Sequence, residues 1–273
     1  MTIGIAVAVP DGIALAADTQ TTWHQTITTA KEKDTGDEFE LQEPIRLPVG
    51  WSRMAKKLFP LTFGGVAFAA CTAGASSVNK RTMYAIFKSL EHSYTGEPSC
   101  NQLTQHLIDG LKDQLQQQHN TDDLASAPVT VCRFIIAGFE NRDVSKPILQ
   151  SHIVFSGKVT TEEGENASGH ILSWSSLQEQ EYRYGGCWIG RVEFITHIVN
   201  HNNPKLPPIS GQYHLMTLAD AVDYTRFLVE FTCDFQRFAI MVPDCGRPIV
   251  SASLTPEGFQ SQVIGELSHM SRA

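Results

Sequence analysis

Residues 2–18 read TIGIAVAVPDGIALAAD, and this stretch decides the fold. Apolar residues alternate with small ones in its first half, which is the period of a β-strand; they are Ile3, Ile5, Val7 and Val9. Pro10-Asp11-Gly12 then favours a turn, because proline presets φ, aspartate bonds back to the backbone and glycine tolerates a positive φ. Residues 13–17 run back to Asp18 as a second strand. The pattern predicts a β-hairpin that places the N-terminus inside a sheet.

The composition is that of a globular protein. With 273 residues, of which 42% are hydrophobic and 18% charged, the chain can bury a sizeable core as a single domain over 1–273. A net charge of −8 argues against nucleic acid or an anionic membrane as the main partner. The sequence contains no G-x-G-x-x-G or Walker-type loop, and His197 and His201 lack a third ligand nearby. We therefore expect no cofactor and no metal.

The cysteines and the N-terminus indicate the compartment. None of the six cysteines has CxxC spacing and several lie in apolar runs, which favours reduced, buried thiols; they are Cys71, Cys100, Cys132, Cys187, Cys233 and Cys245. The opening lacks a basic segment and Pro10-Asp11-Gly12 interrupts its apolar run, so we do not expect it to be a signal peptide. No apolar run approaches the ~18–20 residues of a membrane span. We expect a cytoplasmic protein.

The rest of the chain alternates between strand and helix patterns. We interpret 21–50 as strand ends joined by an irregular polar excursion, and 264–273 as a polar tail. Further strands are predicted over 54–61, 66–72, 129–138, 148–155, 171–174, 182–188 and 248–254. Helices are predicted over 75–94, 101–121, 192–199 and 218–231. An α+β fold would bury every apolar face: a four-layer αββα sandwich, with two stacked antiparallel sheets and a helix pair on each outer side.

Several short stretches resemble one known family in their order. Thr2 becomes the first residue if Met1 is removed, and Ala16-Ala17-Asp18 follows it at the family's spacing. Lys56-Lys57-Leu58-Phe59 precedes an apolar strand that ends in Ala73-Gly74, and Gly246–Val250 is similar to the family's closing strand. The chain resembles the N-terminal nucleophile (Ntn) hydrolases, specifically proteasome β-subunits and their bacterial homologues.

The chemistry of that family explains why a threonine would come first. A threonine hydroxyl is a poor nucleophile until a base removes its proton. The free α-amino group of the same residue has a reference pKa of about 7.7–8.0 and can act as that base near neutral pH. The resemblance therefore implies that Thr2 is the nucleophile once Met1 has been removed.

The resemblance also implies charged residues beside the nucleophile. Asp18, at the end of the adjacent strand, would orient it and balance charge. A lysine on the next strand would lower the pKa of its neighbours. Lys57 fits the family rhythm best, Lys56 is a rival, and Lys31 or Lys33 fit if the polar excursion lies elsewhere.

Three further positions follow from the resemblance. The backbone N–H of Gly74, at a strand end, would stabilise an oxyanion. Asp234 and Cys245 are the candidates for the family's downstream aspartate and serine. The family has Gly-Ser where this chain has Gly190-Arg191, and this departure affects the group around the terminal amine.

The function implied is a threonine-type peptidase or amidohydrolase that cleaves peptide or amide bonds through an acyl-enzyme. The family's subunits form rings, which implies a homo-oligomer and an ATP-driven unfoldase as a partner. Two alternatives stay open. The chain could be a catalytically inactive scaffold or ring subunit of the same fold, or an Ntn amidase acting on small molecules.

Overall fold

The computed structural model describes residues 2–32, 35–36, 38–160, 166–174, 184–199, 212–239 and 243–264. Two five-stranded sheets form its centre, and all their strand pairs are antiparallel. In order, the first sheet contains β12 (Gly185–Gly190), β1 (Ile3–Val9), β2 (Gly12–Asp18), β13 (Ile249–Thr255) and β14 (Gly258–Ile264). The second contains β11 (Asn166–Trp174), β10 (Pro147–Thr160), β9 (Thr130–Phe139), β6 (Val66–Gly74) and β5 (Leu58–Phe63).

The N-terminal hairpin predicted from residues 2–18 is confirmed. β1 and β2 pair from Gly4↔Ala17 to Val9↔Gly12, and every residue in both strands is buried. Gly12 has a φ of +154°, and a Cβ there would lie 2.8 Å from the carbonyl oxygen of Leu254. The hairpin is central in its sheet because its alternating side chains contribute to a core on each face.

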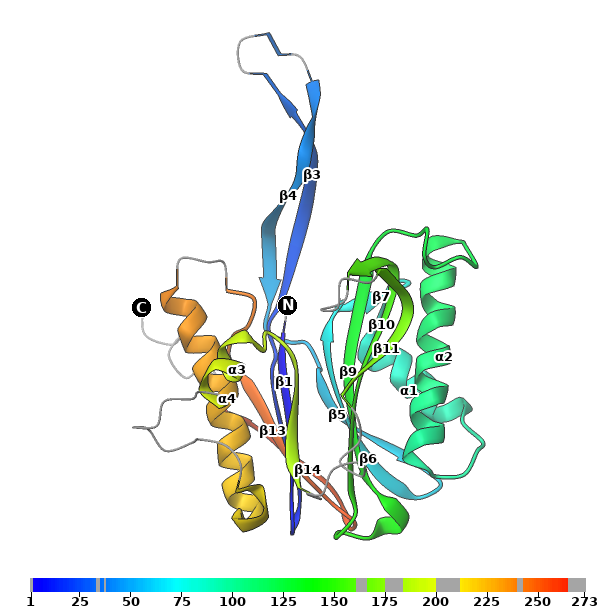
Figure 1. Cartoon of the computed structure of the whole chain (residues 1–273), viewed down its shortest axis with the longest axis vertical. Coiled ribbons are helices and arrows are strands. Elements are labelled where there is room, and N and C mark those ends of the chain that lie inside the picture. The colour runs from blue at the N-terminus through cyan, green and yellow to red at the C-terminus, as the bar shows by residue number, and fades with distance from the viewer. Residues whose placement is uncertain are drawn as a thin grey trace.

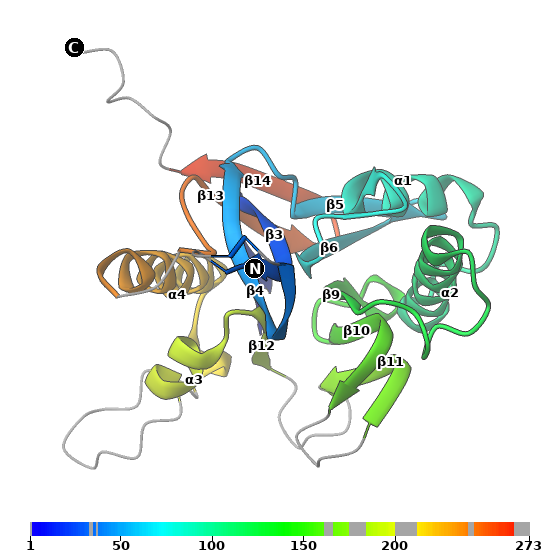
Figure 2. The ribbon, with the colours of Figure 1, turned by 90° about the horizontal axis from the view of Figure 1, so that it is seen from above.

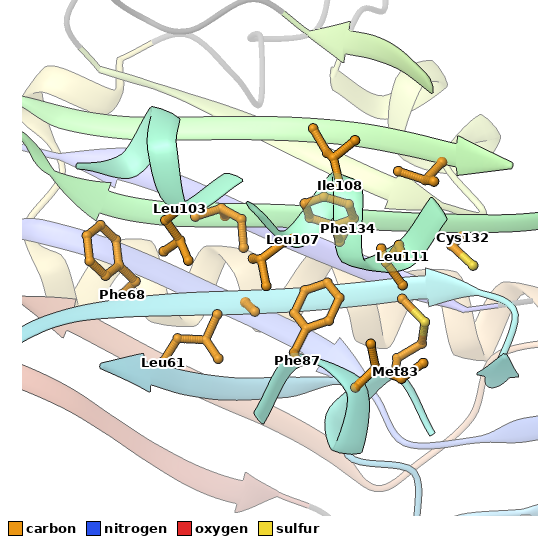
Figure 3. Close-up of a cluster of buried hydrophobic side chains, with 14 of the residues drawn as sticks. Leu61, Phe68, Met83, Phe87, Leu103, Leu107, Ile108, Leu111, Cys132 and Phe134 are labelled. Atoms are coloured by element: carbon orange, nitrogen blue, oxygen red, sulfur yellow. The ribbon is translucent and has the colours of Figure 1, made fainter. Parts of the chain in front are cut away.

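Helices cover the outer face of each sheet (Figures 1 and 2). α1 (Met83–Ser93) and α2 (Cys100–His119) pack on the second sheet, where Phe87 and Phe134 meet edge to face at 5.3 Å between ring centroids. Figure 3 shows this aromatic pair surrounded by aliphatic side chains from α2. α3 (Glu193–Val199) and α4 (Leu218–Phe238) pack on the first sheet.

The inner faces of the two sheets share a third core. Small side chains from both sheets meet there, including Ala6 and Ala8 of β1 with Ala69 of β6 and Ala137 of β9. Such small residues let two sheets approach closely while still excluding water. The result is a mixed α/β architecture in which the described helices lie outside the paired sheets.

The expectation of an irregular excursion over 21–50 is wrong. β3 (Thr21–Lys31) and β4 (Glu38–Ser52) form a two-stranded antiparallel ribbon from Thr21↔Ser52 to Lys31↔Glu38. Figure 1 shows that this ribbon stands away from the body, beginning at the end where the N-terminus lies. Its sequence is polar because none of the three cores includes its residues, while its many threonines still favour a pleated strand.

The helix predicted from residue 75 begins later. β7 (Ser77–Val78) and β8 (Arg81–Thr82) form a small hairpin first, with Asn79 and Lys80 in left-handed conformations at φ of 48° and 60°. Thr82 then caps α1, because its hydroxyl accepts the N–H of Ala85 at 3.2 Å. This cap decides the helix start, which the apolar spacing alone placed too early.

The prediction for the chain's end also needs correction. The sequence predicts a tail from residue 264, but β14 extends through Ile264 and pairs with β13 from Thr255↔Gly258 to Ile249↔Ile264. Its residues alternate weakly because it is an edge strand, which explains why it was missed. Residues 265–273 lie outside the described part of the chain, as do 182–183 of the predicted strand 182–188.

The strand predicted over 54–61 begins at Leu58. Residues 54–57 instead connect the ribbon to β5, and this connection places Lys57 immediately before β5. Within the described ranges, no helix is both long and apolar enough to cross a membrane.

Candidate functional site

A buried ion pair lies where the N-terminal hairpin meets the start of β5. Asp18 is the last residue of β2 and is 0% exposed. The ammonium of Lys57 lies 3.1 Å from each of its carboxylate oxygens and is itself buried. Residues far apart in the sequence therefore form one charged centre under the base of the ribbon.

Three backbone N–H groups also bind the Asp18 carboxylate. Ile3 donates to Oδ1 at 3.1 Å, Gln20 to Oδ2 at 3.1 Å, and Gly246 to Oδ2 at 3.2 Å. Burial raises the pKa of the Asp18 carboxyl above its ordinary value, while the Lys57 ammonium and the N–H groups of Ile3 and Gly246 oppose that rise. All of these partners are hydrogen-bond donors, and an ionised carboxylate, which only accepts hydrogen bonds, suits them.

Thr2 is held at this centre from both sides. The N–H of Ile3, on its C-terminal side, binds Asp18, and the carbonyl oxygen of Thr2 accepts the N–H of Arg191 at 2.9 Å. Gly190 has a φ of +96°, and a Cβ there would lie 1.7 Å from that carbonyl oxygen. The close approach of the two strands requires a glycine, and Thr2 is 4% exposed. Met1 lies outside the described residues.

A second ion pair adjoins Thr2. The Arg191 guanidinium donates through Nε and Nη2 to Oδ2 of Asp244, at 3.0 and 2.6 Å. The side-chain oxygen of Gln236, on α4, accepts the backbone N–H groups of Asp244 and Cys245 at 2.8 and 3.1 Å. α4 therefore positions the segment that carries both Asp244 and the Gly246 N–H.

Sequence reasoning missed Asp244 and Gln236. One signal for Gln236 was available: it continues the row of α4 positions that face the sheet, as Thr225 and Thr232 also do, and its side chain is the longest polar one among them. Asp244 precedes Cys245-Gly246 without a recognisable pattern.

Asp234 lies elsewhere. It is on α4, with its side chain 46% exposed, and it forms an ion pair with Arg247 at 3.2 Å. Asp234 makes no contact with Asp18 among the described residues; Asp244 is the carboxylate that pairs with Arg191, whose backbone N–H binds the Thr2 carbonyl. Cys245 is buried in the core beneath the site, and burial raises the pKa of its thiol well above the ordinary value.

The rival lysines take other positions. The ammonium of Lys56 lies 4.8 Å from the ring centroid of Tyr84. Lys56 is exposed, whereas Lys57 is buried. Lys31 is exposed at the far end of β3, where its backbone lies opposite that of Glu38 in the β3–β4 ladder. Lys33 lies outside the described residues.

Gly74 ends β6 at a φ of +87°, where a Cβ would lie 2.3 Å from the carbonyl oxygen of Val131. β6 also runs beside Lys57, because the N–H of Thr72 binds the Lys57 carbonyl at 2.8 Å. The strand that carries Gly74 is therefore anchored to the charged centre.

No group of three or more His, Cys, Asp or Glu side chains in the described ranges is arranged to hold a metal ion. His197 is exposed on α3, and His201 falls outside those ranges. All six cysteines are buried and none forms a disulfide.

Comparison with known proteins gives a fold but no family. No family model matches the sequence, and no curated protein matches it. Among solved structures, a Gly-1 mutant of Anbu from Hyphomicrobium sp. strain MC1 is 14% identical, with a TM-score of 0.57 over 97% of this chain and 88% of that one. Anbu from the same strain is 13% identical (TM-score 0.55, 97% and 88% covered).

Anbu from Yersinia bercovieri, described as an ancestral beta-subunit, is 14% identical, with a TM-score of 0.54 over 97% of this chain and 87% of that one. At these identities the likeness concerns the fold alone. The chain has a proteasome-like fold.

Proposed function

We propose that this chain is a proteasome-like N-terminal threonine hydrolase that cleaves peptide or amide bonds after Met1 is removed. The observation that carries the proposal is the buried Lys57–Asp18 pair, whose carboxylate also binds the N–H of Ile3, next to Thr2. The proteasome-like fold supports it. On this proposal the two sheets and their outer helices are the four-layer αββα sandwich of Ntn hydrolases.

In the proposed reaction the α-amine of Thr2 accepts the proton of its own hydroxyl, and Oγ1 attacks the substrate carbonyl carbon. The N–H of Gly74 stabilises the resulting oxyanion. The intermediate then collapses: the C–N bond breaks, the amine product leaves with the proton, and an ester to Oγ1 remains. Water attacks this ester and releases the acid, which regenerates Thr2.

Lys57 and Asp18 would serve this reaction electrostatically. A buried ammonium close to the nucleophile favours its deprotonated form, because an opposite charge stabilises a developing alkoxide. Asp18 holds that ammonium with both oxygens and fixes the backbone of the adjacent Ile3. The pair would thus position and polarise the site without taking part in bond making.

A catalytically inactive scaffold of the same fold is the second candidate. The Arg191–Asp244 pair favours it, because the resemblance implies a serine at the sequence position of Arg191, and the guanidinium of Arg191 is engaged with Asp244 instead. A third candidate, an amidase for small molecules, draws on the β3–β4 ribbon, whose base adjoins Lys57 through Gln20. A homo-oligomeric ring, an ATP-driven unfoldase partner and a cytoplasmic location complete the proposal.

The test combines intact mass with labelling by a peptidyl epoxyketone, which reacts with the hydroxyl and amine of an N-terminal threonine. We expect purified protein to lack Met1 and to gain one adduct, and Thr2→Ala to gain none. Thr19→Ala is the matched control, because Thr19 is a nearby threonine whose hydroxyl is engaged with the carbonyl of Pro248 at 2.9 Å.

Two outcomes would redirect the assignment. Protein that keeps Met1, or Met-free protein that stays unlabelled, would favour the scaffold. Labelled protein that hydrolyses simple amides but no member of a peptide library would favour the amidase.

A further inference from the structure

The edge strand β14 presents unpaired backbone groups. Among the described strands it pairs with β13 alone, and Figure 2 shows it at the rim of the first sheet. Thr255 and Gly258 close the two-residue turn between these strands, so they form a hydrogen-bonded pair. Hydrogen-bonded pairs alternate along an antiparallel ladder, and the β13–β14 register is unbroken. Phe259, Ser261 and Val263 therefore direct their N–H and C=O groups away from β13.

Nothing in the sequence of β14 blocks this edge. The strand reads GFQSQVI and contains neither a charged residue nor a proline, which are the usual means of keeping edge strands apart. Gln260, Ser261 and Gln262 are exposed, and Val263 is 55% exposed. The outer side of β14 is therefore open to a further strand.

The edge strand β5 of the second sheet shows the contrast. Its ladder with β6 starts at the pair Phe63↔Val66, and the same alternation directs Pro60 and Thr62 outward. Pro60 has no N–H to offer, and the N–H of Thr62 donates to Oε1 of Glu91, on α1, at 2.6 Å. The fold thus closes the edge at β5 and leaves the edge at β14 open.

We infer that β14 pairs with β14 of a second copy of this chain, antiparallel about a two-fold axis at Ser261. The sequence of the strand favours this occupant, because its residue types repeat in both directions from Ser261. A glutamine lies on each side, and beyond the glutamines lie Phe259 and Val263. A foreign strand would match the backbone alone, whereas a second copy also matches the side chains, as an isologous contact requires.

Each pair across this contact is chemically matched. Ser261 of one copy faces its equivalent, and the two exchange a pair of backbone hydrogen bonds. Phe259 of one copy faces Val263 of the other and extends the core between the sheets, because Phe259 already packs against that core. Gln260 faces Gln262 on the opposite face of the strand, where each amide can donate and accept. The first sheet would continue from one copy into the other.

This contact differs from those of the ring proposed above. Rings close through heterologous contacts, whereas a two-fold contact is isologous, so paired β14 strands would join two rings and not neighbours within one. The contact also does not depend on whether Thr2 is catalytic.

Charges placed on the two-fold axis test the pairing. In sedimentation equilibrium of the full chain, we expect wild type to contain an even number of copies. Ser261→Lys and Ser261→Glu each place like charges opposite one another, so each should halve the particle mass, with a dissociation constant weakened at least about tenfold. An equimolar mixture of the two variants brings opposite charges together and should restore the wild-type mass. Ser261→Pro should also halve the mass, because it removes an outward N–H that β13 does not use.

The matched control is Thr62→Lys, which adds the same charge at an exposed residue of the closed edge strand β5 and should leave the mass unchanged. Circular dichroism confirms folding of each variant. A wild type with an odd number of copies, an unchanged mass for the charged variants, or a mixture that stays dissociated would overturn the pairing. A foreign strand on this edge would not respond to the complementary charges.

Epoxyketone labelling of the same samples separates the two proposals. A labelled wild type without paired copies would overturn the β14 contact alone. An unlabelled wild type whose charged variants dissociate and recover on mixing would overturn the hydrolase alone.

Discussion

The Lys57 ammonium lies 3.1 Å from both oxygens of Asp18, and the two side chains are almost entirely removed from water. Their carboxylate also holds the backbone of Ile3 and Gly246, so one ion pair ties together the start of β1, the end of β2 and the segment before β13. Stability and the candidate chemistry consequently depend on the same atoms.

Replacing Lys57 should lower the stability of the fold far more than replacing its neighbour Lys56. Lys57→Ala leaves the Asp18 carboxylate buried without its cation, which costs about 3–5 kcal/mol in the free energy of unfolding. Lys56→Ala is the matched control, because its ammonium contacts the ring of Tyr84 and its loss costs less than about 1 kcal/mol. Urea denaturation measures both. Equal losses for the two lysines would contradict the assignment of the buried cation.

Removing both charges separates structure from catalysis. The double variant Asp18→Asn, Lys57→Met has no buried charge left unpaired, so it should be more stable than Lys57→Met alone by about 1–3 kcal/mol. Its epoxyketone labelling should stay absent, because on the proposed mechanism the Lys57 cation favours the deprotonated nucleophile. Recovered labelling in the double variant would mean that the pair acts only through the fold.

Gly190 should tolerate no side chain. Gly190→Ala places a Cβ against the Thr2 carbonyl at a φ of +96°, so Thr2 must move and labelling should be lost. Gly36→Ala is the control: Gly36 has a φ of +77°, and a Cβ there meets no atom within 4 Å. It should show only a left-handed backbone penalty of about 1 kcal/mol. Labelling that survives Gly190→Ala would show that the Thr2 position is not critical.

The buried thiols should make the protein sensitive to alkali. Burial raises the pKa of Cys71, Cys100 and Cys132 from 9.0 to about 12. Between these values the unfolded chain releases thiol protons that the folded chain keeps, so the free energy of unfolding falls as pH rises. The slope is at most about 1.4 kcal/mol per pH unit for each thiol.

Urea denaturation under reducing conditions at about pH 8 and about pH 10 measures that fall, across the range where free thiols titrate. The triple variant Cys71→Ala, Cys100→Ala, Cys132→Ala should lose less stability between the two. An identical pH dependence in both proteins would show that these thiols are not responsible.

Local sequence patterns predict much of the fold. Alternation around Pro10-Asp11-Gly12 sufficed for the β1–β2 hairpin, because that turn and its strand pairing involve neighbours in the chain. The apolar spacing of α2 was equally informative, since its buried residues recur on one face. The start of α1 and the edge strand β14 were less readable, because a cap and a pairing partner decide them.

Local sequence patterns do not predict the ribbon over 21–52 or the residues that surround Thr2, since both depend on tertiary structure. Polar residues do not reveal by hydrophobicity that β3 and β4 will pair, since their stabilisation comes from the backbone ladder. The sequence by itself determined that Thr2 directly precedes a buried strand, with Asp18 at the end of the next strand. The family resemblance indicated Lys57 and drew attention to Arg191, but only the packing of distant segments decided that Lys57 pairs with Asp18 and Arg191 with Asp244, because a buried charge needs a partner within hydrogen-bond distance.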